Sequence, residues 1–237
     1  MHVLVTRPGS DAERTAEELR RCGHTVTLVP LLQIVPVRDA ALGPGPYAAV
    51  LMTSANAARA IARHPGGDAL LGLPVFTVGR RTAVAAGDAG FARVTASDGG
   101  WPELVRLVAD TLGGIRERLI YLAAEERSGD VAGALAAHAL TVETVVIYRA
   151  VPNPAFAQAL RAALEGALDG VLHYSRRSVQ MFLTGARSAG RIDAALALQH
   201  FCLSSEVAAP LRAAGAATVK VAPRPEESAL LGLLNFG

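Results

Sequence analysis

Hydroxyl and guanidinium groups gather in this sequence where short apolar runs end. The segment HYSRRS, residues 173–178, follows an apolar run and precedes VQMFL, so two serines and two adjacent arginines stand between an expected strand and helix. TSAN, residues 53–56, has a similar place in the sequence. Such groups, together with the unsatisfied N–H groups of a helix start, can bind an anion. They can equally be solvated helix caps, and at any single turn both interpretations stay open.

Further turns of this kind are VTRPGSDAER (5–14), VGRRT (78–82), LAAEERSGD (122–130) and CLSSE (202–206). Because the pattern recurs in both halves of the chain, it favours binding of a large polyanion over capping alone. The candidate binding residues are Thr6, Arg7, Ser54, Asn56, Arg80, Arg81, Thr82, Arg127, Ser128, Ser175, Arg176, Arg177, Ser178, Ser204 and Ser205.

Strand and helix patterns alternate along the chain, which predicts an α/β fold with parallel sheets flanked by helices. Strands are expected at 2–6, 25–30, 48–53, 74–79, 118–123 and 141–149, with helices at 56–64, 81–90, 101–112 and 154–166 between or after them. Ser10, with Glu13 three residues later, is expected to cap a helix that extends to about residue 21.

The chain also repeats itself. At an offset of 116, Leu19 lies over Leu135 and Val26 over Val142, and the later elements follow in the same order in both halves. Two similar lobes are therefore expected. Ligands of parallel α/β sheets bind beyond the carboxyl ends of the strands, so the turns are expected to face a cleft that holds the polyanion.

Composition and motifs exclude several classes of protein. The chain has 237 residues, of which 51% are hydrophobic, and a net charge of +2 without a basic stripe, so we expect no nucleic-acid partner. No apolar run is long enough to span a membrane and no signal peptide is visible, which predicts a cytoplasmic protein. Cys22 and Cys202 are expected to be reduced.

No cofactor or metal site is expected. The histidines show no metal-ligand spacing, and His173 is more readily explained as a buried or half-buried side chain than as a catalyst. GPGPYA, residues 43–48, precedes a strand instead of following one, and its prolines remove N–H donors that a pyrophosphate would need, so it is a connector.

The chain resembles the uroporphyrinogen-III synthase family. The resemblance rests on LVTRP at the start, VIYR (146–149), the serine turns TSANAA and YSRRSV, the GRRTA turn (79–83) and the VAP segment (221–223), and it covers essentially the whole chain. The turn LSSEVA departs from the family, which usually has glycine and threonine there. The resemblance implies an enzyme that closes hydroxymethylbilane to uroporphyrinogen III, with inversion of the last pyrrole ring and loss of water.

The resemblance also implies the domain boundaries. Residues 1–36 and 153–237 would form one discontinuous domain and residues 39–149 the other, joined by extended linkers near 36–39 and 149–153 that let the lobes reorient. Sequence alone would have placed a single boundary near residue 118. Prolines 36, 152 and 154 suit extended connectors.

Tyr148 is the catalytic residue that the resemblance implies, as the proton donor for loss of water. The alternative is a strand-end aromatic residue that anchors the linker. The partner implied is a linear tetrapyrrole polyanion, handed over by hydroxymethylbilane synthase to a monomeric enzyme. Two other possibilities stay open, a non-catalytic two-lobed module that binds an anionic ligand and a synthase-like regulatory domain without activity.

Overall fold

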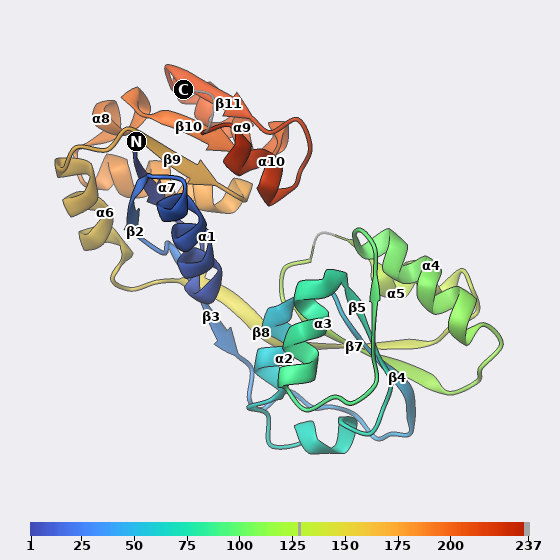
Figure 1. Cartoon of the computed structure of the whole chain (residues 1–237). Helices are drawn as coiled ribbons and strands as arrows, with labels where there is room; N and C mark the ends of the chain where they lie inside the picture. The colour runs from blue at the N-terminus through green and yellow to red at the C-terminus, as the bar shows by residue number, and fades with distance from the viewer. Residues whose placement is uncertain (128, 235–237) are drawn as a thin grey trace. The chain divides into compact units, whose positions relative to one another are not determined.

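The structure is a computed structural model that describes residues 1–127 and 129–234. Contacts within the chain divide it into unit 1, Met1–Gln33 with Val151–Gly237, and unit 2, Ile34–Ala150. Each unit contains one sheet with helices on both of its faces (Figure 1). In the described part of the chain, no helix combines the length and the apolar character that crossing a membrane requires.

Unit 1 contains a five-stranded parallel sheet in the order β11-β10-β9-β1-β2. Its strands are β1 (His2–Val5), β2 (Thr25–Leu28), β9 (Gly170–His173), β10 (Gln199–Cys202) and β11 (Thr218–Val221). Its helices are α1 (Gly9–Arg21), α6 (Phe156–Glu165), α7 (Arg176–Ser188), α8 (Ile192–Ala197), α9 (Ser205–Ala213) and α10 (Glu227–Gly232).

Unit 2 contains a six-stranded sheet in the order β3-β8-β7-β4-β5-β6. Its strands are β3 (Leu32–Pro36), β4 (Tyr47–Met52), β5 (Val75–Val78), β6 (Val94–Ser97), β7 (Arg118–Ala124) and β8 (Val142–Pro152). Its helices are α2 (Ala55–Ile61), α3 (Gly79–Asp88), α4 (Trp101–Leu112), α5 (Val131–Ala136) and the short 3-10 helix η1 (Gly67–Leu70).

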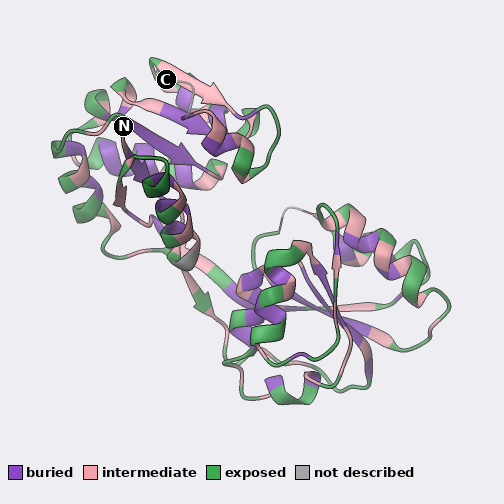
Figure 2. Ribbon diagram, viewed as in Figure 1, coloured by how far each residue is buried: buried purple, intermediate pink, exposed green. Residues whose placement is uncertain are grey.

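Alternating side chains of each buried strand explain the layers. In β7, Ile120 and Leu122 pack on the side of α2 and α3, whereas Leu119 and Tyr121 pack on the side of α4 and α5. In unit 1, α6, α7 and α9 cover one face of the sheet and α1 and α10 the other. The central strands are apolar on both faces, as parallel sheets require, and they form the buried layer in Figure 2.

Several details differ from the sequence predictions. Helix α1 begins at Gly9 with Pro8 at the N-cap position, so Ser10 lies inside the helix and the predicted Ser10 cap was wrong. Strand β6 and helix α8 were not expected. The predicted parallel α/β architecture is confirmed, and α4 begins at Trp101 as predicted.

Two histidines pair in the core of unit 1. His173 at the end of β9 and His200 in β10 are both fully buried, and Nε2 of His173 lies 3.0 Å from Nδ1 of His200. Phe182 packs edge-on against both rings. Burial lowers the pKa of His173 well below its usual value and that of His200 to about 4, so both are neutral at neutral pH.

Candidate functional site

Three of the predicted serines cap helices that follow strand ends. Ser54, Ser175 and Ser204 accept hydrogen bonds from the backbone N–H groups of residues 56, 178 and 207, at 3.2, 3.1 and 3.3 Å. Each lies at the carboxyl end of a parallel strand, so the capping interpretation is confirmed for these hydroxyl acceptors. Capping leaves the hydroxyl proton of Ser54 or Ser204 able to point elsewhere.

The other hydroxyl residues at these turns differ in exposure. Ser178 is buried, and its Oγ lies 2.8 Å from Oγ of Ser175. Thr82 is buried inside α3, whereas Ser205 is exposed at the first turn of α9. Thr6 is buried and donates to the carbonyl of Leu172 at 3.1 Å, so its hydroxyl stabilises the packing of β1 on β9. Ser128 lies outside the described residues.

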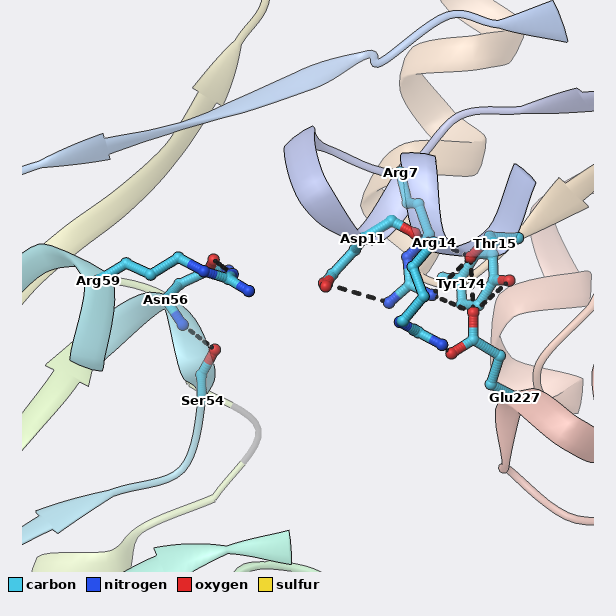
Figure 3. Close-up of polar contacts among 9 residues, drawn as sticks. All are labelled: Arg7, Asp11, Arg14, Thr15, Ser54, Asn56, Arg59, Tyr174 and Glu227. Atoms are coloured by element: carbon cyan, nitrogen blue, oxygen red, sulfur yellow. Dashed lines mark hydrogen bonds and ion pairs between the residues drawn. The ribbon is translucent and has the colours of Figure 1, made fainter. Parts of the chain in front are cut away.

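Most of the predicted arginines are exposed at the turns. Arg176 is exposed and Arg177 is half-buried in the first turn of α7. Arg80 and Arg81, with Arg59 and Arg63, line a hollow of about 500 Å³ at α2 and α3. Nη1 of Arg59 donates to Oδ1 of the predicted residue Asn56 at 3.0 Å, as Figure 3 shows.

Arg7 is engaged by side chains of unit 1. Its guanidinium forms ion pairs with Asp11 and with Glu227 at the start of α10, and it lies 4.0 Å from the centre of the Tyr174 ring. The carboxylate of Glu227 also accepts hydrogen bonds from Arg14, Thr15 and Tyr174 (Figure 3). These residues are called the Glu227 cluster here, with the members Arg7, Arg14, Thr15, Tyr174 and Glu227.

In the Glu227 cluster, donors that could bind the carboxylate of a ligand instead bind the carboxylate of Glu227. Burial alone would raise the pKa of Glu227, but the hydroxyl of Thr15 and the guanidinium groups of Arg7 and Arg14 outweigh burial and lower it to about 2. Burial, with the charge of Glu227, raises the pKa of Tyr174 to about 12. The prediction that Arg7 contacts a ligand therefore has a competitor, since Glu227 already occupies this arginine.

Unit 2 has an open counterpart to this filled site. A cavity of about 320 Å³ lies at the carboxyl ends of β4, β5 and β7, beside the start of α4. It is called the aromatic cavity here. Its polar and aromatic lining includes Thr53, Ser54, Trp101, Tyr121, Arg127 and Tyr148.

A β-bulge places Tyr148 in the wall of this cavity. Ala123 pairs with Val146 but Ala124 pairs with Tyr148, so one extra residue, Ile147, stands in β8. Ile147 and Tyr148 are consequently both buried in the core although they are neighbours in the strand. Bulges of this kind redirect side chains and occur near active sites. Tyr148 is thus both a core residue and a wall of the cavity.

Tyr121 and Thr53 are site residues that sequence reasoning did not select. The hydroxyl of Tyr121 lies 2.8 Å from Oγ1 of Thr53, and burial raises the pKa of Tyr121, so its phenol stays protonated at neutral pH. Arg127, which was predicted, is exposed, and its Nη1 donates to the carbonyl of Ala124 at 3.3 Å. The charge of Arg127 lowers the pKa of Tyr121, but burial outweighs this effect.

Trp101 and Gly129 also shape the cavity. Trp101 is half-buried at the first position of α4, and a Cβ atom built on Gly129 would overlap its indole ring. Only glycine leaves room for this close approach. The sequence placed Trp101 at the first position of a predicted helix, after a pair of glycines, and this place could have marked it as a possible site residue. Its contact with Gly129 could not be predicted from local sequence. No group of three or more His, Cys, Asp or Glu residues suited to a metal ion occurs in the described chain.

Solved structures share this fold. Uroporphyrinogen-III synthetase from Helicobacter pylori 26695 is 16% identical and superposes with a TM-score of 0.67, with 99% of this chain and 98% of that one covered. A mutant uroporphyrinogen III synthase from the extremely thermophilic bacterium Thermus thermophilus is 20% identical with a TM-score of 0.54, and 99% and 97% are covered. At these identities the likeness shows the fold, so the chain is an α/β protein of the same class.

The particular family follows from the sequence profile. The profile of uroporphyrinogen-III synthase HemD matches residues 13–232, which is most of the chain. No curated protein sequence matches it. The chain belongs to the uroporphyrinogen-III synthase family, which acts in tetrapyrrole biosynthesis. The resemblance inferred from the turns and from VIYR is confirmed.

Proposed function

We propose that the chain is an active hydro-lyase that closes hydroxymethylbilane to uroporphyrinogen III, inverting the terminal pyrrole ring and releasing water. The observation that carries this proposal is the bulge in β8, which places the phenol-bearing side chain of Tyr148 in the wall of a cavity with Tyr121 and Arg127.

Tyr148 acts in this proposal as the general acid. The pyrrole nitrogen lone pair expels the hydroxyl of the hydroxymethyl group, the C–O bond breaks, and the phenol proton joins the leaving hydroxide as water. The cation formed is attacked by the substituted carbon of the last ring, which gives a spiro intermediate. Cleavage and closure at the other position then invert that ring, and loss of a ring proton returns Tyr148 to its protonated state.

Turns that follow strand ends bind the carboxylates of the substrate in this proposal. The exposed guanidinium groups of Arg176 and Arg80 and the backbone N–H groups at the starts of α7 and α3 supply the donors. Holding the two ends of the bilane near each other lowers the entropic cost of ring closure, so binding itself provides part of the rate.

The test is turnover of freshly prepared hydroxymethylbilane with identification of the product isomer. The proposal expects the isomer with one inverted ring, whereas closure without inversion gives a different isomer. Tight binding of the bilane with no acceleration of closure would support the binding-module alternative. The proposal also places the enzyme in the cytoplasm as a monomer that receives its substrate from hydroxymethylbilane synthase, which fractionation, sedimentation and coupled assays test.

A further inference from the structure

The aromatic cavity and the Glu227 cluster occupy equivalent places in the two units. Helix α4 follows β6 in unit 2 as α10 follows β11 in unit 1, and each helix packs on the same face of its sheet. The first residue of α10 is Glu227, and the first residue of α4 is Trp101. A carboxylate therefore stands in unit 1 where an indole stands in unit 2.

The contents of the two places differ accordingly. In unit 1 the carboxylate of Glu227 accepts hydrogen bonds from Arg7, Arg14 and Thr15 within the chain. In unit 2 the equivalent region is a cavity of about 320 Å³ whose lining combines rings with an exposed guanidinium, that of Arg127. Glu126 lines it as well and opposes an anion, so the guanidinium and the phenol of Tyr121 must outweigh that carboxylate.

We propose that the aromatic cavity binds one pyrrole ring of the substrate, with an acidic substituent of that ring held by Arg127 and the hydroxyl of Tyr121. This inference rests on the proposed function and adds to it a specific subsite. Ligand cavities usually measure about 300–1,000 Å³, so this one admits part of a linear tetrapyrrole and not four rings. A flat, electron-rich ring suits the faces and edges of Trp101, Tyr121 and Tyr148.

Protonation and charge suit the acidic substituent. The pKa of Tyr121 is raised by burial, so the phenol keeps the proton that it would donate to a carboxylate. The guanidinium of Arg127 lines the cavity from the loop after β7. Thr53 Oγ1 lies 2.8 Å from the Tyr121 hydroxyl, and when Thr53 donates to the phenol oxygen the phenol proton is left for the carboxylate.

Trp101 provides a direct reporter, because it is the single tryptophan of the chain. The probe is a monopyrrole that carries one acetate and one propionate substituent, titrated into the whole protein while indole emission is recorded. Saturable quenching or a spectral shift is expected. Unsubstituted pyrrole should bind much more weakly because it has no carboxylate, and an aliphatic dicarboxylate should bind more weakly because it has no ring. Emission of N-acetyltryptophanamide in the same titration corrects for absorption by the probe.

Variants locate the probe. Arg127→Gln should weaken binding about tenfold, the effect of one lost charge-assisted hydrogen bond. Gly129→Ala should change the emission of the free protein and weaken binding, because the new methyl group displaces the indole. Arg116→Gln is the matched control, since Arg116 is exposed at the amino end of β7 and makes the same change of charge far from the cavity.

Calorimetry on the same solutions records binding that leaves the emission unchanged. The inference is overturned if no binding is detected by either method, or if Arg127→Gln and Gly129→Ala leave the Kd of the monopyrrole unchanged. Turnover of hydroxymethylbilane by the same preparation separates the two proposals. Normal turnover without monopyrrole binding rejects the subsite and leaves the function intact, whereas absent turnover rejects the function.

Discussion

Unit 1 and unit 2 arrange five strands in the same order, and yet they treat the strand ends differently. The order β11-β10-β9-β1-β2 of unit 1 corresponds to β6-β5-β4-β7-β8 of unit 2. Unit 1 closes the ends of β1 and β9 with the Glu227 cluster, whereas unit 2 leaves the aromatic cavity at the ends of β4 and β7. One scaffold therefore supports a partly buried ion-pair network in one copy and a cavity lined by aromatic and polar side chains in the other.

The largest effect is expected from removal of the charge that fills unit 1. Glu227→Gln removes one of the two carboxylates paired with the guanidinium of Arg7, whose side chain is only 13% exposed, and should destabilise unit 1 by about 2–3 kcal/mol. Urea unfolding followed by circular dichroism should show the shift, while Trp101 fluorescence, which reports unit 2, should not. Glu226→Gln is the control, because Glu226 is exposed and its ion pair with Arg224 is long, at 3.8 Å.

The same carboxylate predicts acid sensitivity. Because the pKa of Glu227 is about 2 in the folded chain and near 4.5 without neighbours, its contribution is complete above about pH 4.5 and is lost as the pH falls toward 2. The stability of Glu227→Gln should depend less on pH in that window. An equal pH dependence in both proteins would show that the Glu227 cluster does not stabilise unit 1.

The next effect separates Tyr148 in β8 of unit 2 from Tyr174, which follows β9 in unit 1. Tyr148→Phe should lower kcat about tenfold to a thousandfold with little change in KM, because only the proton donor is lost. Tyr174→Phe removes the same atom from the Glu227 cluster of unit 1 and should affect stability instead of kcat. Both are measured below the unfolding transition of each variant. If Tyr148→Phe and Tyr174→Phe lower kcat equally, the two tyrosines do not have different roles in the two units.

Local sequence patterns were enough to predict most of the strands and helices of both units. Apolar runs separated by capped turns define β4, α2 and β5 locally, so the alternation and the parallel sheets were predictable. Strand β6 was missed because VTAS is short, half polar and lies at the edge of its sheet. Local patterns are strong where a strand is buried on both faces and weak where it is not.

The site was harder to predict than the fold. Hydroxyls at turns were visible, and Ser54 and Ser175 do lie at helix starts. One ion-pair partner of Arg7 is Glu227, which is 220 positions away along the chain, and Gly129 meets Trp101 only through tertiary packing. The bulge that redirects Tyr148 depends on the register of β7 and β8, which no single strand reveals.

A smaller effect concerns the histidine pair, which unit 2 does not share. The positions equivalent to His173 and His200 are the buried residues Met52 and Val75. Because burial lowers the pKa of both histidines, the unfolded chain binds more protons than the folded one below about pH 6.5, and unit 1 should lose stability as the pH falls from there toward 4, by about 2 kcal/mol from His200 alone.

Transplanting the unit 2 residues tests this. The double variant His173→Met with His200→Val should make the urea midpoint of unit 1 nearly independent of pH from 6.5 to 5, where Glu227 stays ionised. The baseline stability is compared at pH 8, where the histidines are neutral in both states. A wild-type midpoint that stays constant from pH 6.5 to 5 would show that the pair does not couple to folding.

The smallest effect is expected at the exposed arginines of the two units. Arg176→Gln in unit 1 and Arg80→Gln in unit 2 should each raise KM a few-fold with little change in kcat, since carboxylate binding is shared by ground and transition states. Raising the ionic strength should reduce the difference from wild type, because exposed charges are screened. If neither KM changes, these arginines are solvated residues beside helix caps.

The division of the chain also sets an order for folding during synthesis. Unit 2 is continuous, Ile34–Ala150, whereas unit 1 joins Met1–Gln33 to Val151–Gly237. At about 5–20 residues per second, a ribosome releases all of unit 2 seconds before the strands that complete the sheet around β1. Strand β1 pairs with β2 on one edge and with β9 on the other, so its β9 edge stays unpaired while unit 2 folds. The nascent chain therefore keeps the β9 edge of β1 unpaired until residues 170–173 have been synthesised.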